Sequence, residues 1–163
     1  MSGVEMRSSE ETMILDSVDK FLERDVRPVA RELEASDTYP QAIVDRMIEL
    51  GLFGATISTE YGGLGLSATT YASIIERISA VWMSVSGIFN SHLIMAAAVQ
   101  RFGTTHQKKH YLPRFASGEL RGGIGLTEPD CGTDLQGIRT QAVGEDDHYV
   151  VNGVKTWITN SAE

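Results

Sequence analysis

The chain has 163 residues, of which 42% are hydrophobic and 22% are charged, and its formal net charge is −8 at pH 7. This length allows one well-packed core, or one domain and part of another. The acidic balance argues against a protein that holds a nucleic-acid backbone, because such proteins need clustered lysine and arginine.

The N-terminal stretch MSGVEMRSSEETM is polar and acidic, unlike a signal peptide or an arginine-rich transit peptide. The sequence contains no run of about 18 apolar residues, so we expect no membrane span. Its single cysteine, Cys131, rules out an internal disulfide framework and suits a reducing compartment. These features together predict a soluble cytoplasmic protein.

Residues 8–118 show the period of helices. Ser8 and Glu11 have the spacing of a capping box, in which the two residues satisfy each other's backbone N–H groups. Pro28 should kink or divide the first helix, because proline lacks the N–H that a helix interior needs. The apolar residues of this first region recur at helical spacing and comprise Ile14, Val18, Phe21, Leu22, Val26, Val29 and Leu33.

A second helix should begin at Pro40, since proline suits the first helical turn, and end at Gly51, where glycine allows a left-handed cap. The side chains expected on its buried face are Ile43, Val44, Met47, Ile48 and Leu50. The stretch TEYGGLGLS, residues 59–67, then breaks the helical period, and its glycines predict a loop.

Helical periodicity returns over residues 71–80 and 84–102. Thr104 should cap a further helix that carries basic residues. His106 and His110 on this helix have the i, i+4 spacing of metal ligands. The H-E-x-x-H pattern of a zinc protease is missing, so we interpret this segment as an exposed basic helix.

After the last helix the pattern changes to the period of strands. Strands are predicted at residues 122–128 (GGIGLTE), at residues 138–143 (IRTQAV) and within residues 148–159 (HYVVNGVKTWIT). Asn152-Gly153 is the strongest short hairpin signal in the chain and predicts a tight turn between strands.

The predicted fold class is therefore α+β, with an all-α domain over residues 1–119 followed by the first strands of a β domain over residues 120–163. About four strands would form, and such a sheet leaves an apolar edge unpaired. We therefore expect the chain to be the front portion of a longer protein.

The polar loop TEPDCGT follows the first predicted strand and is a candidate site. No phosphate-loop pattern occurs, and the G-I-G segment before it runs into Glu128 where a dinucleotide-binding turn needs glycine. Cys131 and Glu128 are interpreted as a packing residue and a structural carboxylate rather than as nucleophile and base. The loop can hydrogen-bond an anion or a polar ring edge, or it is only a structural turn. Trp157 is either a core strand residue or, with Thr159, faces a cofactor.

Two motifs in this region resemble those of the acyl-CoA dehydrogenase family. The first has the order small, aliphatic, Ser/Thr, Glu, then small, Gly, Ser/Thr, Asp and small, and it is matched by Gly125, Leu126, Thr127, Glu128, Gly132, Thr133, Asp134 and Gly137. The second, aliphatic-Asn-Gly-x-Lys-x-Trp-Ile-Thr-Asn, is matched by residues 151–160. The stretches YGGLGLS and QKKHYLPRFASGEL agree as well, so the resemblance spans nearly the whole chain.

The resemblance implies a helical domain and a β-barrel-like middle domain, followed by a C-terminal helical domain that is absent from these residues. FAD would lie between the last two domains. Thr127 would hydrogen-bond the flavin, while Thr133 and Asp134 would contact the substrate, and Trp157 and Thr159 would flank the flavin near N5. The implied cofactor-binding residues are Ile124, Leu126, Thr127, Gly132, Thr133, Trp157, Ile158 and Thr159.

The activity that the resemblance implies is FAD-dependent α,β-dehydrogenation of an acyl-CoA thioester by a homotetramer or homodimer, with electrons passed to an electron-transfer flavoprotein. No catalytic residue is assigned, because the family's glutamate base would lie downstream of Glu163. Residues 1–163 alone should therefore be inactive and hold FAD weakly. Two alternatives stay open: an acyl-CoA oxidase or flavin monooxygenase of the same fold that uses O₂, and a non-catalytic helical interaction module.

Overall fold

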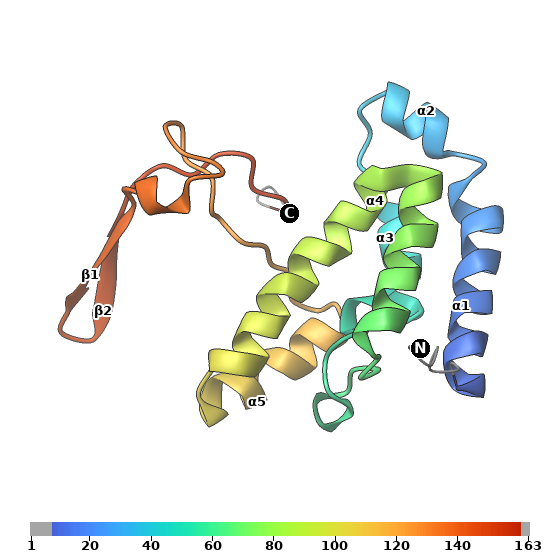
Figure 1. The fold of residues 1–163 in the computed structure, drawn as a ribbon, viewed down its shortest axis with the longest axis horizontal. Coiled ribbons are helices and arrows are strands. Elements are labelled where there is room, and N and C mark those ends of the chain that lie inside the picture. Colours follow the sequence, from blue (N-terminus) through green and yellow to red (C-terminus); the bar gives the residue numbers. More distant parts are fainter. Residues whose placement is uncertain (1–7, 161–163) are drawn as a thin grey trace, which may run out of the picture.

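A computed structural model describes residues 8–160 of the chain. Helices form the N-terminal part and pack into a bundle, whereas the C-terminal part leaves the bundle as extended chain and carries a β-hairpin (Figure 1). The predicted α+β fold class is confirmed. Residues 1–7 and 161–163 lie outside the described part of the chain.

The first helical region is divided at Pro28, as the sequence predicts. Helix α1 spans Ser9–Phe21, a π-helical turn spans Leu22–Val26, and after a turn helix α2 spans Ala30–Ala35. The capping box is confirmed: the Glu11 N–H donates to Ser8 Oγ at 3.1 Å, and the Ser8 N–H donates to the Glu11 carboxylate at 3.0 Å. The capping box therefore fixes the start of α1, and Pro28 separates the first helical stretch from α2.

Helix α3 spans Gln41–Glu49 and ends before Gly51, whose φ of +73° is the left-handed conformation expected there. After it the chain folds back on itself through two short 3₁₀ turns. The N–H of Leu64 donates to the Gly54 carbonyl at 2.9 Å, and the N–H of Gly65 donates to the Ile57 carbonyl at 2.8 Å. The predicted loop is therefore a tightly hydrogen-bonded unit and not a mobile connector.

Helix α4 spans Ala68–Phe102 and is bent in the middle. Trp82 has non-helical backbone angles, φ −156° and ψ 102°, so the element consists of two arms that diverge from this kink (Figure 1). The two helices predicted over residues 71–80 and 84–102 are these two arms. The indole N–H of Trp82 donates to the Glu34 carboxylate, and the Ser84 hydroxyl donates to the same oxygen at 3.2 Å. Helix α2 therefore contacts the kink through hydrogen bonds to its Glu34 side chain.

The core lies where α1, α3, both arms of α4 and helix α5, Thr105–Ala116, meet. His92 is fully buried, with its ring 5.1 Å from the Phe53 ring and 5.5 Å from the Phe115 ring. Its Nε2 lies 3.2 Å from the carbonyl oxygen of Phe115, so a histidine joins α4 to α5 inside the core. Other large side chains without solvent contact are Phe89, Met47, Leu52, Ile57, Ile74, Ile78 and Leu112.

Among the described residues one helix, α4, is long and apolar enough to cross a membrane by length and composition alone. Of its most apolar 18-residue window, 44% is buried inside the bundle. Core helices of soluble proteins share these properties, so α4 is weak evidence for a membrane span.

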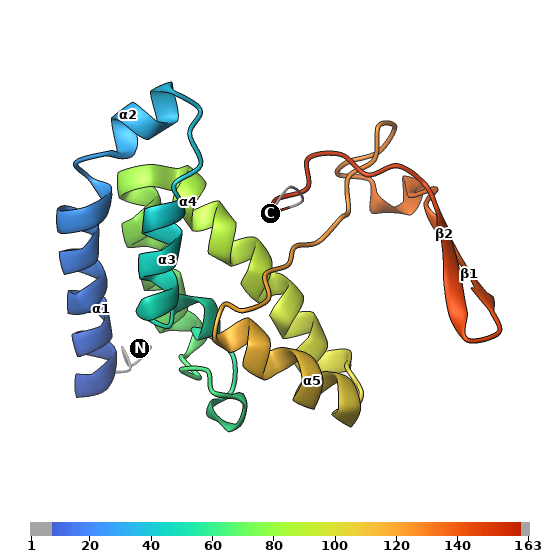
Figure 2. The same ribbon diagram turned by 180° about the vertical axis from the view of Figure 1, so that it is seen from behind.

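The C-terminal part forms fewer strands than the sequence predicts. Strands β1, Gln141–Glu145, and β2, His148–Asn152, pair antiparallel, with Val143 opposite Val150. Residues 122–128 were predicted as a strand but form none, because no segment within residues 8–160 pairs with them beyond one isolated bridge. The hairpin stands away from the bundle in both views (Figures 1 and 2).

The hairpin turn also lies elsewhere than predicted. It is formed by Asp146 and Asp147, and Asp146 takes the left-handed φ of +47°. Aspartate is one of the few non-glycine residues that adopts this conformation readily, because its short side chain bonds locally. The predicted turn at Asn152-Gly153 is wrong: this pair ends β2 and leads into the segment that returns to the helices.

Candidate functional site

A concavity of about 250 Å³ lies where three segments of the chain meet. The second arm of α4 contributes Ser91 and Ile94. The other two walls hold six of the eight residues that the sequence analysis assigns to cofactor binding, namely Ile124, Leu126, Thr127, Trp157, Ile158 and Thr159. Residues about 30 positions apart in the sequence are thus brought to one place, and we take this concavity as the candidate site.

Glycines allow the three walls to approach each other. A Cβ on Gly123 would lie 2.6 Å from the Thr159 carbonyl oxygen, and a Cβ on Gly122 would lie 2.5 Å from the Met95 methyl group on α4. The chain after α5 crosses the second arm of α4 at this point (Figure 2). Gly123 is therefore required by close packing against backbone, which a side chain would prevent, whereas the Met95 methyl group opposite Gly122 is the end of a flexible side chain and can move.

A buried carboxylate ties the two motifs together. Glu128 is 7% exposed and accepts hydrogen bonds from the N–H groups of Arg139 and Thr140, at 2.8 and 2.9 Å, and from the Lys155 ammonium at 2.9 Å. The same ammonium donates to the Leu126 carbonyl at 3.0 Å. Since these donors saturate the Glu128 carboxylate, its role is structural, as the sequence analysis expected.

The environment of Glu128 stabilises its charged form. Contact with Thr140, then the N–H of Arg139 and the ammonium of Lys155, lowers the pKa of Glu128 from 4.5 to about 2. A carboxyl whose pKa is lower in the folded chain stabilises the fold above its unfolded pKa, and this contribution is lost as the pH falls through the folded value. Glu128 therefore stabilises the loop fully above about pH 4.5 and ceases to do so near pH 2.

We expect the backbone amide signals of Arg139 and Thr140 to report this titration. In a pH series of ¹⁵N-correlation spectra both signals should shift with a midpoint near pH 2, and Glu128→Gln should abolish the shift. Asp130→Asn is the matched control: this exposed carboxylate pairs with the Arg139 guanidinium and with neither reporter N–H group, so its loss should leave the midpoint unchanged. A midpoint at the ordinary value of about 4.5 would contradict the assigned hydrogen bonds.

Trp157 is the most exposed large side chain of the site. Its exposed fraction is 92%, and its φ of +59° lies in the left-handed region, an outlier for a bulky residue. The interpretation of Trp157 as a core strand residue is wrong, because residues 153–158 form no strand and the indole lies open at the concavity. A strained, uncovered aromatic ring is suited to stack on a planar ligand.

The remaining candidate residues lie outside the concavity. Gly132, Thr133 and Asp134 are exposed on the polar loop, and no atom lies within 4 Å of a Cβ built on Gly132. Cys131 is half-buried and exchanges two backbone hydrogen bonds with Glu128, at 2.9 and 3.2 Å, which agrees with a packing role. Among the described residues, no packing contact requires a glycine at position 132. The role of Gly132 in ligand binding stays a prediction.

The two histidines with metal-ligand spacing are exposed on α5. Their rings stack in parallel, with centroids 6.1 Å apart. Within residues 8–160 no group of three or more histidine, cysteine, aspartate or glutamate side chains could hold a metal ion. The interpretation of α5 as an exposed basic helix agrees with this geometry.

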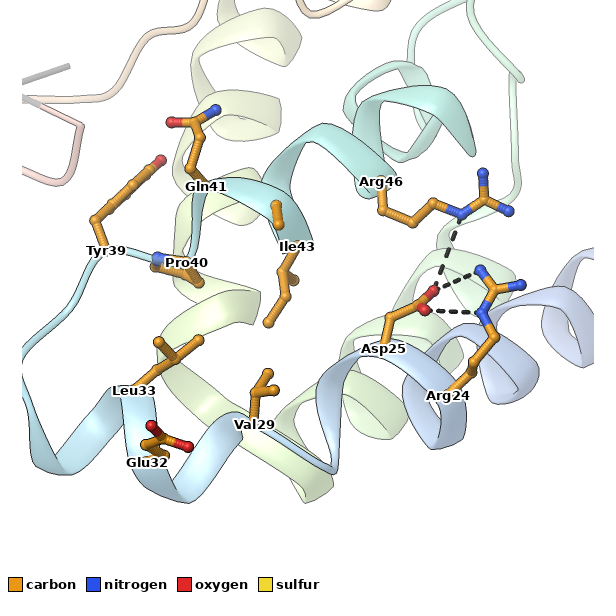
Figure 3. Close-up of a pocket in the computed structure, with 11 residues that line it drawn as sticks. Arg24, Asp25, Val29, Glu32, Leu33, Tyr39, Pro40, Gln41, Ile43 and Arg46 are labelled. Atoms are coloured by element: carbon orange, nitrogen blue, oxygen red, sulfur yellow. Dashed lines mark hydrogen bonds and ion pairs between the residues drawn. The ribbon is translucent and has the colours of Figure 1, made fainter.

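A larger cavity, of about 830 Å³, lies between α2 and the start of α3 (Figure 3). Its apolar lining includes Val29, Leu33 and Ile43. Of its charged groups, Arg24 and Arg46 both pair with Asp25. Arg24 donates two hydrogen bonds of 2.7 Å to Asp25. No residue of the two motifs lines this cavity, so we do not assign the cofactor to it.

Comparison with known proteins follows the same division of the chain. Residues 8–119 match the family described as "Acyl-CoA dehydrogenase, N-terminal domain", and residues 123–163 match "Acyl-CoA dehydrogenase, middle domain". The Clostridium acetobutylicum protein named "Acyl-CoA dehydrogenase, short-chain specific" is 38% identical over 152 residues, which are 93% of this chain and 40% of that protein. The chain therefore spans about two fifths of this relative and 28% of the "(2S)-methylsuccinyl-CoA dehydrogenase" of Cereibacter sphaeroides, which is also 38% identical.

Solved structures share the fold over almost the whole chain. A chain from the structure of the electron transferring flavoprotein of Acidaminococcus fermentans matches with a TM-score of 0.91 and 33% identity, over 100% of this chain and 43% of that one. Acyl-CoA dehydrogenase complexed with FAD from Bacillus anthracis matches with a TM-score of 0.83 and 37% identity, over 98% of this chain and 28% of that one.

Proposed function

Because the chain belongs to the acyl-CoA dehydrogenase family, we propose that it supplies the N-terminal helical domain and one wall of the flavin site of a FAD-dependent acyl-CoA dehydrogenase. The observation that carries this proposal is the convergence of two separate motifs on one concavity against α4. The domain division proposed is residues 1–119 and 120–163.

The residues of the concavity fit one side of a flavin ring. Its volume of about 250 Å³ is too small for a whole dinucleotide, so it would hold part of the ring system. Aliphatic side chains exclude water from the ring, the Trp157 indole can stack on it, and the hydroxyls of Thr127 and Thr159 can bond its polar edge. When bound, the flavin supplies the acceptor for a hydride.

No carboxylate of the described residues lines the concavity, so none is placed to remove an α-proton there. Glu128 has a lowered pKa and a saturated carboxylate, so it is a poor proton acceptor at neutral pH. Glu11 is bound into the capping box and accepts hydrogen bonds from Ser67 and Thr70. We propose that the base comes from outside residues 1–163 and that these residues alone do not dehydrogenate acyl-CoA.

The proposed partners follow from the proposed reaction. The substrate would be an acyl-CoA thioester, and electrons would pass to an electron-transfer flavoprotein; the similarity to a chain from the Acidaminococcus fermentans structure supports this acceptor. A homo-oligomer is proposed from the family resemblance. A cytoplasmic location is proposed because the one cysteine, Cys131, is free.

The function can be tested with a chimera in which residues 1–163 replace the matching part of the Clostridium acetobutylicum relative. The chimera should bind FAD, and an acyl-CoA should bleach the flavin absorbance under anaerobic conditions. Thr159→Ala should slow this bleaching, whereas the exposed Thr105→Ala on α5 should not. Residues 1–163 by themselves are the second control and should show no turnover above the free-flavin background.

Three outcomes would contradict parts of this proposal. A folded chimera without bound FAD would contradict the flavin site. Rapid reoxidation of the reduced flavin by air would indicate an oxidase or monooxygenase that uses O₂, and not a dehydrogenase. Turnover by residues 1–163 alone, measured with a dye acceptor over short, medium and long acyl-CoAs, would show that the base lies within this chain.

A further inference from the structure

One side chain joins all three walls of the concavity without lining it. The Nδ2 amide of Asn160 donates to the carbonyl oxygens of Ile88 on α4 and of Gly122 on the crossing segment, both at 3.1 Å. Ile88 precedes Ser91 by about one helical turn, Gly122 lies two residues before Ile124, and Asn160 follows Thr159 directly. The side chain is thus connected through short stretches of backbone to every wall.

The residue type at this position fits the geometry. Asn160 has a φ of +65°, a conformation that asparagine tolerates better than most non-glycine residues. A carboxamide nitrogen carries two N–H donors, and here each of them meets one carbonyl. The Ile88 carbonyl has a second lone pair, so it can accept this bond in addition to its bond within α4. An asparagine therefore serves both carbonyls without breaking the helix.

Around Asn160 the segment that holds Gly122 and Gly123 is in close contact with both α4 and the segment that holds Thr159. A Cβ on Gly122 would meet the Met95 side chain at 2.5 Å, and a Cβ on Gly123 would meet the Thr159 carbonyl at 2.6 Å. The Thr156 N–H donates to the Thr127 carbonyl at 2.9 Å and adds a second link between the two loop walls. The Gly123 contact and the Thr156 hydrogen bond hold the two loop walls against each other, whereas the Asn160 amide attaches them to α4.

We propose that Asn160 is a positioning residue of the flavin site. Its amide fixes the separation between the α4 wall and the two loop walls, and thereby the width of the concavity in which the ring would lie. The residue does not line the concavity, so it acts through the residues it holds. Its functional meaning rests on the proposed flavin site, whereas the hydrogen bonds themselves can be tested separately.

Two substitutions separate the amide from the backbone conformation. Asn160→Gly keeps the freedom to adopt positive φ and removes the side chain. Asn160→Asp keeps the shape but replaces the two donors by a carboxylate that faces two carbonyl oxygens. Asn152→Asp is the matched control, because Asn152 is exposed at the end of β2 and the same charge is introduced there.

Hydrogen exchange of residues 1–163, followed by mass spectrometry, tests the attachment. Both Asn160 variants should raise the exchange rate of the Thr156 amide, which donates to the Thr127 carbonyl, at least about tenfold, while α1 and α3 keep their protection. The Asn152 control should exchange like the wild type. Unchanged exchange in the peptide that contains Thr156 would overturn the proposal, and so would an equal rise across the whole chain, which indicates only lower global stability.

FAD binding by the chimera tests the consequence for the site. Each Asn160 variant should raise the dissociation constant for FAD at least about tenfold, with the unfolding temperature of the helical bundle unchanged. Wild-type affinity in the Asn160 variants would overturn the positioning role. The two tests can also disagree. If the wild-type chimera does not bind FAD but the Asn160 variants still exchange faster at Thr156, the proposed flavin site is contradicted, whereas the attachment of the loop walls by Asn160 is supported.

Discussion

Gly63→Ala should unfold much of the helical domain. A Cβ at this position would lie 2.1 Å from the carbonyl oxygen of Ile57 and 2.6 Å from its carbonyl carbon. Ile57 is fully buried, and its carbonyl accepts the Gly65 N–H at 2.8 Å, so the backbone cannot move aside without breaking the folded loop. We expect a loss of about 3 kcal/mol or more in the free energy of unfolding, measured by urea denaturation with far-UV circular dichroism.

The neighbouring glycine provides the control for this prediction. Gly62 has a φ of +82°, and no atom lies within 4 Å of a Cβ built there. Gly62→Ala should therefore cost only the strain of a left-handed alanine, about 1 kcal/mol. Equal effects of the two substitutions would show that backbone conformation, and not the contact with Ile57, decides the stability of this loop.

Gly123→Ala should disrupt the candidate site and leave the bundle folded. The added Cβ would lie 2.6 Å from the Thr159 carbonyl oxygen, so residues 122–125 and 155–160 must separate. This separation removes the hydrogen bond from the Thr156 N–H to the Thr127 carbonyl. In the chimera we expect FAD affinity to fall at least about tenfold, because the walls no longer enclose the ring.

Thermal unfolding followed by far-UV circular dichroism should be unchanged in Gly123→Ala, since the clash lies outside the core cluster. Gly144→Ala is the matched control for the same chemical change, because it lies on the exposed strand β1 away from the concavity and its Cβ would meet Tyr149 only at an ordinary 3.6 Å. A Gly123 variant with normal FAD affinity would indicate that the two walls are free to move apart without consequence for binding.

The helical part of the fold could be predicted from the sequence because its signals are local. The capping box of Ser8 and Glu11, the break at Pro28 and the cap at Thr104 each involve residues within one helical turn. The kink near Trp82 was visible as an interruption between two periodic stretches. Only the contact at the kink, between the Trp82 indole and the carboxylate of Glu34 from another helix, required the structure.

Strand pairing could not be predicted with the same success, because it depends on partners that are distant in the sequence. Residues 122–128 have a strand-like pattern, yet no segment among the described residues pairs with them as a strand. The hairpin turn was assigned to Asn152-Gly153 by propensity alone, whereas the register of Val143 with Val150 places it at Asp146 and Asp147.

The candidate site shows the same limit. The two motifs and the resemblance named six residues of the concavity, but they gave neither Ser91 and Ile94 nor the fact that both loop walls lie against α4. The ion pair between Glu128 and Lys155 joins residues 27 positions apart, and neither residue type alone indicates the pairing. Asn160 was part of the second motif, and only the three-dimensional contacts gave it a separate role.

The position of the kink at Trp82 also determines which side chains of the second arm of α4 face the core and which face the loops. Each residue added to an α-helix turns the following residues by about 100° around the axis. One extra residue just after Trp82 would therefore rotate the second arm, turning His92 out of the core and Ser91 away from the loops that it faces. The number of residues between Trp82 and each later position of α4 thus sets which side chains face the core and which face the concavity. Inserting or deleting a single residue between Trp82 and Ile94 is therefore incompatible with keeping both faces in place.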